Sequence, residues 1–198
     1  MPPGLVLATG NPGKIREFRA LLGGLGYEVQ TLLDHPNVTL PPEGAVSYAE
    51  NARGKAWAAA AGTGLLAVGD DSGLEVLALG GRPGIESARY GGPGLTEAER
   101  VERLLAALAG VTLRAARFRC ILALVAPWGE TVLVEGVTDG VLTEAPRGAA
   151  GFGYDPIFLV PALGRTLAEL SPPEKHGVSH RGRAVAAARP PLTRWVRR

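Results

Sequence analysis

Cysteine, long apolar runs and an excess of charge of one sign are scarce in this sequence. The single cysteine, Cys120, excludes an intramolecular disulfide and any zinc site that requires two thiolates. No stretch reaches 18 uninterrupted apolar residues, so we expect no membrane-spanning helix. The net charge is only +2, and no run of Lys or Arg is longer than Arg197 and Arg198. A protein that holds duplex nucleic acid through a basic face is therefore not expected.

Residues typical of a secretion signal and lysines are also few. Residues 1–9 have neither the basic lead-in nor the apolar length of a secretory signal. Together with the lone cysteine, this predicts a soluble cytoplasmic protein whose partners are neither nucleic acids nor membranes. Of the 21 basic residues only three are lysines, at Lys14, Lys55 and Lys175, so these positions stand out as places where arginine is not used.

What the sequence does contain is typical of a globular protein. Apolar residues make up 46% and charged residues 20% of the 198 residues, which is enough to bury a core. The length fits one domain, and we expect residues 1–198 to form a single domain. The 28 glycines and 16 prolines lie between periodic segments and not in repeats, which predicts many tight loops.

The apolar pattern alternates short strands with helices. It predicts strands at residues 4–9, 27–33 and 65–69, an extended segment at 74–79, and a long hairpin from 116–126 and 131–142. It predicts a turn at 10–13 that leads into a helix ending at about 22, and further helices over 47–61, from 96 to about 108, over 179–188 and over 192–198. Capping boxes mark two of these starts, at Ser47 with Glu50 and at Thr96 with Glu99. The pattern indicates a mixed α/β (α+β) fold with two lobes and a central mixed sheet flanked by helices.

The first polar loop follows the first predicted strand and opens a helix. It consists of Thr9, Gly10, Asn11, Pro12, Gly13 and Lys14. A glycine-containing turn at a helix start presents free backbone N–H groups and the positive end of the helix dipole, and Lys14 adds a mobile charge. These are the requirements for binding phosphate, although the spacing is not that of a Walker motif. The alternative is that Asn11 only caps the helix, with Pro12 at its first position, and that Lys14 is solvated.

The second polar loop is a pair of aspartates. Asp70 and Asp71 follow the apolar strand at 65–69, and adjacent side chains at a strand end point to opposite sides. One carboxylate would therefore face a ligand while the other supports it. Two neighbouring carboxylates need a cation or donors, and Mg²⁺ shared with substrate phosphates is the natural candidate; the alternative is an Asx turn. Glu43 and Glu50 could add a metal carboxylate, and Glu43 is favoured because Glu50 is expected in the capping box.

Two later loops carry residues suited to recognising a base. Glycines around an aromatic allow a flat ligand to approach, so Phe152 could stack on a base, or the aromatics of this loop could belong to the core. The last loop brings donors suited to a base carbonyl or a phosphate, with a solvated basic helix end as the alternative. The residues of the two loops are Phe152, Gly153, Tyr154, Asp155, Lys175, His176, His180 and Arg181.

Together these loops resemble the inosine triphosphate pyrophosphatase family, in particular its bacterial members that act on dITP and XTP. The resemblance runs nearly from end to end, in six segments at residues 5–14, 50–52, 70–74, 84–90, 151–158 and 179–182. It implies an elongated α/β subunit that works as a homodimer. It also implies Mg²⁺-dependent hydrolysis of non-standard purine nucleoside triphosphates (ITP, dITP, XTP) to the monophosphate and pyrophosphate, which cleanses the nucleotide pool.

The resemblance also assigns roles to individual residues. It implies that the loop from Thr9 to Lys14 binds the triphosphate, that Glu43 and Asp71 bind the metal, and that Asp71 accepts a proton. Ser72 would lie beside the substrate. The nucleoside pocket would be formed by Phe152, Gly153, Tyr154, Asp155, Lys175, His180 and Arg181.

The implied chemistry agrees with the residue types. Breaking the bond between the α- and β-phosphates requires charge neutralisation and an oriented water, which Mg²⁺, Lys14 and a carboxylate can supply. Donors from Lys175, His180 or Arg181 would satisfy a 6-keto oxygen and disfavour the 6-amino group of adenine. Two other functions fit the same loops, namely a pyrophosphatase for modified pyrimidine triphosphates and a non-catalytic nucleotide or RNA sensor.

Overall fold

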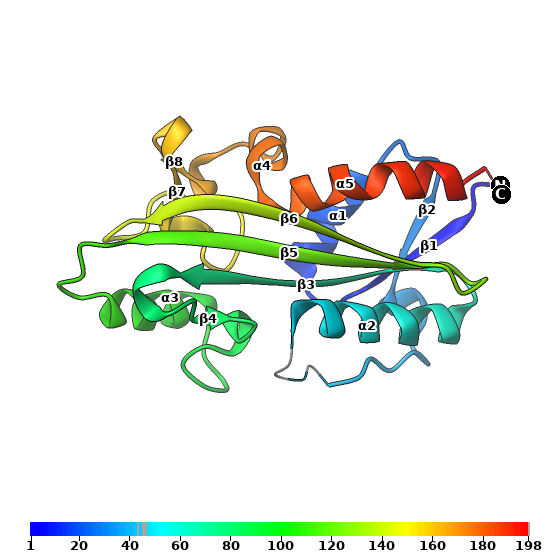
Figure 1. Ribbon diagram of the computed structural model, residues 1–198, viewed down its shortest axis with the longest axis horizontal. Helices are drawn as coiled ribbons and strands as arrows, with labels where there is room; N and C mark the ends of the chain where they lie inside the picture. The colour runs from blue at the N-terminus through cyan, green and yellow to red at the C-terminus, as the bar shows by residue number, and fades with distance from the viewer. Residues whose placement is uncertain (43, 45–46, 198) are drawn as a thin grey trace. The chain divides into compact units, whose positions relative to one another are not determined.

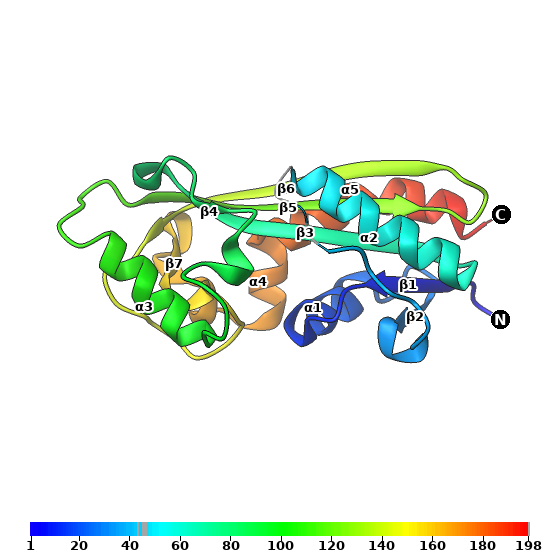
Figure 2. The same ribbon diagram turned by 90° about the horizontal axis from the view of Figure 1, so that it is seen from below.

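The computed structural model describes residues 1–42, 44 and 47–197 (Figures 1 and 2). The strands are β1 (Gly4–Ala8), β2 (Glu28–Thr31), β3 (Leu66–Val76), β4 (Pro83–Gly84), β5 (Ala115–Val125), β6 (Thr131–Leu142), β7 (Phe158–Val160) and β8 (Arg165–Thr166). The helices are α1 (Pro12–Leu22), α2 (Tyr48–Thr63), α3 (Glu97–Ala107), α4 (Pro172–Val178) and α5 (His180–Trp195). No helix of the described residues is long and apolar enough to cross a membrane.

These strands form one mixed sheet. Its order is β2-β1-β3-β5-β6-β7-β8, and β4 pairs with β3. β1 is parallel to β2 and β3, whereas β3 with β4, β6 with β7, and β7 with β8 are antiparallel. The predicted mixed α/β fold is therefore confirmed. The chain divides into two compact units, which are described separately below.

The first unit contains Met1–Asp71, Cys120–Gly136 and Arg181–Arg198. Alternation along β1 sends Leu5 and Leu7 into a core with residues of α1 and α5, whereas Val6 and Ala8 enter a core with α2. Strand β1 is therefore covered by α1 and α5 on one face and by α2 on the other (Figure 1). A polar residue of the neighbouring strand β3 therefore faces either α1 and α5 or α2, according to the face of the sheet from which it projects.

The second unit contains Ser72–Arg119 and Val137–His180. Its core is built from the second half of β3, the first half of β5, α3 and the segment around β7. The rings of Phe118 and Phe158 pack at a centroid distance of 4.6 Å, and Leu74 and Leu104 are fully buried beside them. This core supports the glycine-rich loop at 151–155.

Helix starts were predictable from local sequence. Asn11 caps α1 with Pro12 in the first turn, and Ser47 caps α2 by accepting a hydrogen bond from the backbone N–H of Glu50 at 3.2 Å. The box of Thr96 and Glu99 forms in full at the start of α3. Each side-chain cap satisfies an N–H group that has no partner within the helix.

Two predicted element boundaries are wrong, and one helix was not predicted. The strand predicted to end at residue 69 continues as β3 to Val76, so Asp70 and Asp71 lie inside it. The helices predicted at 179–188 and 192–198 are one helix, α5, which runs through Pro190 and Pro191. The segment before it forms a further helix, α4, that was not predicted. In the first two cases tertiary contacts outweigh local signals that usually end an element.

Candidate active site

The phosphate-loop candidate is a well-formed helix start in the first unit. The hydroxyl of Thr9 accepts a hydrogen bond from the backbone N–H of Asn11 at 3.2 Å, and Asn11 Oδ1 accepts one from the backbone N–H of Lys14 at 3.1 Å. Gly10 is exposed and Gly13 is buried. Asn11 thus caps the helix, and this cap is compatible with phosphate binding because it leaves other N–H groups of the first turn available. Lys14 is paired with Asp70 and is not the solvated side chain of the alternative.

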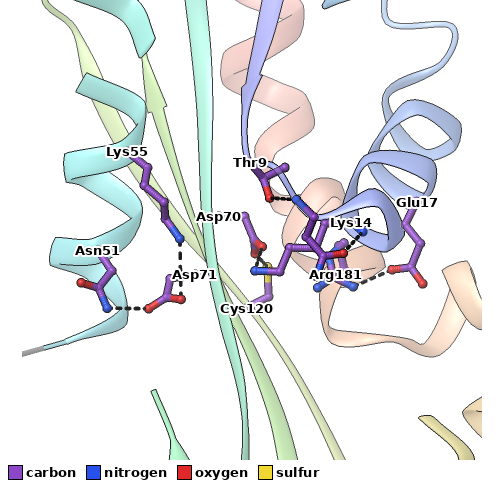
Figure 3. A network of polar contacts seen from close by, with 10 residues as sticks. Thr9, Lys14, Glu17, Asn51, Lys55, Asp70, Asp71, Cys120 and Arg181 are labelled. Carbon is purple, nitrogen blue, oxygen red and sulfur yellow. Dashed lines mark hydrogen bonds and ion pairs between the residues drawn. The ribbon is translucent and has the colours of Figure 1, made fainter. Parts of the chain in front are cut away.

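Lys14 and Arg181 share a buried charged network with two carboxylates (Figure 3). Lys14 Nζ forms an ion pair with Asp70, which is 1% exposed. Arg181, 2% exposed, donates to Glu17 Oε2 at 2.5 Å. Burial lowers the pKa of Arg181, but the carboxylates of Asp70 and Glu17 outweigh it and hold that pKa above its ordinary value. The network therefore places two cations beside two carboxylates in a buried place.

Asp71 points to the opposite face of β3, toward α2 (Figure 3). Its Oδ2 accepts a hydrogen bond from Asn51 Nδ2 at 2.9 Å, and its Oδ1 lies 3.8 Å from Lys55 Nζ. Gly69 makes this contact possible, because a Cβ there would lie 2.1 Å from the carbonyl oxygen of Ala52. The predicted opposition of the two carboxylates is confirmed, and each one has its own lysine.

The aspartate pair lies just beyond the end of β1. Ala8, the last residue of β1, pairs with Gly69 of β3, and the chain then leaves the sheet through Thr9 into α1. In sheets with parallel strands, ligands bind outside the carboxyl ends of the strands. Thr9, Asp70 and Asp71 all adjoin this end of β1, although Asp70 and Asp71 face opposite sides.

A cavity of about 220 Å³ lies against the first half of α2. It is lined by Pro41, Pro42, Gly44, Glu50, Asn51, Gly54 and Lys55. Asn51 and Lys55 also contact Asp71, so the cavity adjoins this carboxylate. Glu43, the favoured second metal ligand, lies outside the described residues, whereas Glu50 borders the cavity.

The described residues suit Mg²⁺ only in one of its usual binding modes. They contain no group of three or more His, Cys, Asp or Glu that could hold a metal ion. Mg²⁺ usually keeps several waters and is held by one or two carboxylates plus substrate phosphates. A buried Asp71 beside a cavity that Glu50, Asn51 and Lys55 help to line fits that mode, in which the nucleotide itself brings ligands.

The base-pocket candidates of the second unit centre on Asp155. Its Oδ2 accepts from the backbone N–H of Phe152 at 2.8 Å and from Lys175 Nζ at 2.5 Å, and both Asp155 and Lys175 are buried. Lys175 Nζ lies 5.2 Å from the centroid of the Phe152 ring, within cation–π range. The backbone N–H of Gly153 donates to Glu97 at 2.8 Å. Asp155 thus positions the Phe152 ring and the Lys175 ammonium group, the two groups suited to contact a base.

Other predicted site residues have structural contacts. Tyr154 belongs to the core and donates its hydroxyl to the carbonyl of Ser87 at 3.0 Å, and burial raises its pKa. His180 stacks on Phe118 at 4.5 Å with an interplanar angle of 13°. Ser72, which is partly exposed, follows Asp71 on β3. Arg181 makes its contacts inside the first unit, with Glu17 and with the ring of Phe18.

Four residues of these networks were missed as site candidates: Glu17, Asn51, Lys55 and Cys120. Asn51 and Lys55 carried a usable signal, because residues four apart share a helix face and Lys55 is one of three lysines. Glu17 and Cys120 carried none, since their partners are distant in the sequence.

Comparison with known proteins identifies the family of this chain. The dITP/XTP pyrophosphatase of Geobacillus kaustophilus is 49% identical over 183 residues, covering 91% of this chain and 90% of the relative. That of Gloeobacter violaceus is 54% identical over 186 residues, with the same coverage. The solved structure of a HAM1 protein from Coxiella burnetii superposes with a TM-score of 0.87 at 40% identity, covering 97% of this chain and 99% of that one. Because the model of the Ham1 family also matches residues 5–190, the chain belongs to the Ham1 family.

Proposed function

We propose that this chain is a Mg²⁺-dependent pyrophosphohydrolase that converts ITP, dITP and XTP to the monophosphate and pyrophosphate. One observation carries the proposal: Lys14 at the start of α1 and the buried Asp70 and Asp71 all adjoin the carboxyl end of β1. The relatives named dITP/XTP pyrophosphatase support the substrate class.

The first unit would bind the triphosphate. The N–H groups at the start of α1 and the ammonium group of Lys14 offset phosphate charge. Asp71, with Glu43 or Glu50 as a second carboxylate, would hold Mg²⁺ together with the phosphates. When bound, the ion would neutralise charge on the phosphates and polarise the α-phosphate.

Asp71 would also accept a proton during hydrolysis. A water attacks the α-phosphorus, its proton moves to an Asp71 oxygen, and the bond from the α-phosphorus to the bridging oxygen breaks, so that pyrophosphate leaves. Asn51 and Lys55 hold the Asp71 carboxylate in a fixed orientation. The ammonium group of Lys55, 3.8 Å from Asp71 Oδ1, offsets part of the carboxylate charge.

The second unit would recognise the base. Phe152 would stack on the purine, and the ammonium group of Lys175 would donate to the 6-keto oxygen. Adenine presents an amino group at this position, which would place a donor against the donating ammonium group of Lys175. Asp155 supports this role because it holds Lys175 beside the Phe152 ring.

A pyrophosphate-release assay tests the proposal. We expect turnover of ITP, dITP and XTP with Mg²⁺, no turnover after chelation, and little turnover of ATP. Nucleotide binding without pyrophosphate release would instead indicate a sensor, and a preference for modified pyrimidine triphosphates would indicate the other alternative.

The assembly and cellular role follow from the same resemblance. We propose that the chain works as a homodimer that removes non-standard purine triphosphates from the cytoplasmic nucleotide pool. Sedimentation equilibrium should give twice the mass of one chain, and a value of one chain mass at assay concentration would contradict the dimer.

A further inference from the structure

Asp70 has no role in the proposed chemistry, yet it is almost fully buried at the phosphate loop. It forms an ion pair with Lys14 and accepts a hydrogen bond from Cys120 Sγ at 3.1 Å through Oδ1. It faces away from Asp71 and the α2 cavity (Figure 3). Its carboxylate therefore lies beside the cations Lys14 and Arg181.

The exposure of the Lys14–Asp70 pair is unequal. The Lys14 side chain is 15% exposed, whereas the Asp70 side chain is 1% exposed. Lys14 is therefore the member of the pair that a phosphate arriving from solvent can contact. The phosphate must, however, share or take over an ammonium group that already has an anionic partner.

Lysine suits such an exchange better than arginine does. Its ammonium group is a compact charge on a flexible stem with three rotatable donors, whereas guanidinium holds a carboxylate through a rigid two-pronged contact. Arg181, the other cation of this network, is held by Glu17 at 2.5 Å and is far less exposed. Lys14 is thus the one of the two that can turn toward a ligand.

We propose that Asp70 is a positioning residue that competes with nucleotide phosphates for Lys14 and so prevents the pyrophosphate product from being held too tightly. This inference rests on the proposed function. The binding free energy of a phosphate includes the cost of weakening the Lys14–Asp70 pair, which applies to substrate and product alike. Without that carboxylate, Glu17 would remain to offset the charges of both Lys14 and Arg181, and the net charge beside the phosphates would be more positive.

Asp70→Asn tests the competition, because it removes the charge and keeps the shape. The readout is monophosphate formed from ITP in the presence of added pyrophosphate. We expect the inhibition constant of pyrophosphate to fall about tenfold, the factor that corresponds to about 1.4 kcal/mol. KM for ITP should fall as well, while kcat does not rise because product leaves more slowly.

Asp139→Asn is the matched control. It makes the same change in net charge, but Asp139 pairs with Arg117 on the surface of the second unit, with side-chain exposures of 72% and 45%. Its pyrophosphate inhibition should match the wild type. If Asp70 had a merely structural role, Asp70→Asn would raise KM for ITP and weaken inhibition by pyrophosphate. Either of those results, or an unchanged inhibition constant, overturns the inference.

The wild-type chain offers a second measurement in case Asp70→Asn does not fold. With three lysines, protein labelled with ¹⁵N-lysine has three side-chain ammonium signals, and Lys14→Arg assigns one. Pyrophosphate should shift the Lys14 signal and leave that of Lys175, paired with Asp155, unchanged. If the Lys14 signal does not shift at a pyrophosphate concentration that inhibits turnover, the inference is overturned. If the wild type does not turn over ITP, dITP or XTP, the proposed function is refuted instead.

Discussion

Every lysine of the chain is paired with an aspartate at the candidate site. The pairs are Lys14 with Asp70, Lys55 with Asp71 at 3.8 Å, and Lys175 with Asp155 at 2.5 Å. Surface ion pairs, such as Arg165 with Glu174, use arginine instead. A buried charge that loses its partner is strongly destabilising, so these pairs are stable only as pairs. A lysine ammonium group also exchanges partners more readily than the rigid arginine fork does.

Asp71→Asn should preserve the fold and abolish most turnover. The amide keeps the size of the side chain and can still meet Asn51, but it cannot accept a proton. We expect kcat for ITP to fall at least about a hundredfold, the lower end of general-base contributions. Circular dichroism checks folding. Turnover close to wild type in a folded variant would remove Asp71 from the role of base.

Lys14→Ala should weaken triphosphate binding equally for all bases. Losing a charge-assisted hydrogen bond to phosphate costs about 1.5 to 3 kcal/mol, so KM should rise roughly tenfold to a hundredfold. The ratio of kcat/KM between ITP and XTP should stay constant. A changed base preference would show that Lys14 contacts the base.

At the level of residues, sequence alone predicted the individual groups better than their partners. Lys14, Asp70 and Asp71 stood out by composition and by position after a strand. Lys55 stood out by composition alone, but its contact with Asp71 depends on how α2 packs on the sheet. Glu17 did not stand out, because its contact with Arg181 joins segments far apart in the chain. Contacts between segments distant in the chain leave no local pattern in one sequence.

At the level of elements, Gly69 lets α2 approach β3 closely. Gly69→Ala should destabilise the protein by about 1 to 3 kcal/mol, the usual cost of overpacking, because the added methyl group meets the backbone oxygen of Ala52 at 2.1 Å. Chemical denaturation measures this change. Gly177→Ala in α4, where a Cβ would meet nothing within 4 Å, is the control and should be neutral or slightly stabilising. Equal effects of the two variants would contradict the close packing.

Capping carboxylates should make stability depend on acid pH. Hydrogen bonds from Arg165 and Ser171 lower the pKa of Glu174 from 4.5 to about 2. The ionised form thus favours the folded state, so its stabilisation is present above about pH 4.5 and is lost as the pH falls toward about 2. Thermal melting of Glu174→Gln should show a lower Tm than wild type at pH 6, and this difference should shrink below pH 4. A difference that stays constant with pH would refute the assignment.

Element starts were more predictable than element ends. The caps at Asn11 and Thr96 depend on residues within one turn, so the sequence contains the whole signal. The continuation of β3 through Asp70 and Asp71 depends on cations supplied by α1 and α2. The continuation of α5 past Pro190 is accompanied by burial of Leu192 and Trp195 in the core. The sequence around Pro190 does not show this burial.

For the whole molecule, the fold class was predictable and the strand order was not. Alternating strands and helices with one hairpin indicated a mixed sheet, which the structure contains. The order depends on parallel pairing of β1 with β3, whose residues are separated by about sixty positions, Leu5 with Leu66 for example. Only burial of both faces of β1 under helices, a property of the folded chain, selects this pairing.

Three strands, β3, β5 and β6, have residues in both compact units. Unfolding one unit would remove hydrogen-bonded neighbours from strands that continue into the other, so we expect a single cooperative transition. The three tryptophans, Trp57, Trp128 and Trp195, all belong to the first unit, and their fluorescence reports that unit alone. Far-ultraviolet circular dichroism reports both units. Guanidinium titrations followed by the two signals should therefore have the same midpoint, and separated midpoints would show that the units unfold independently.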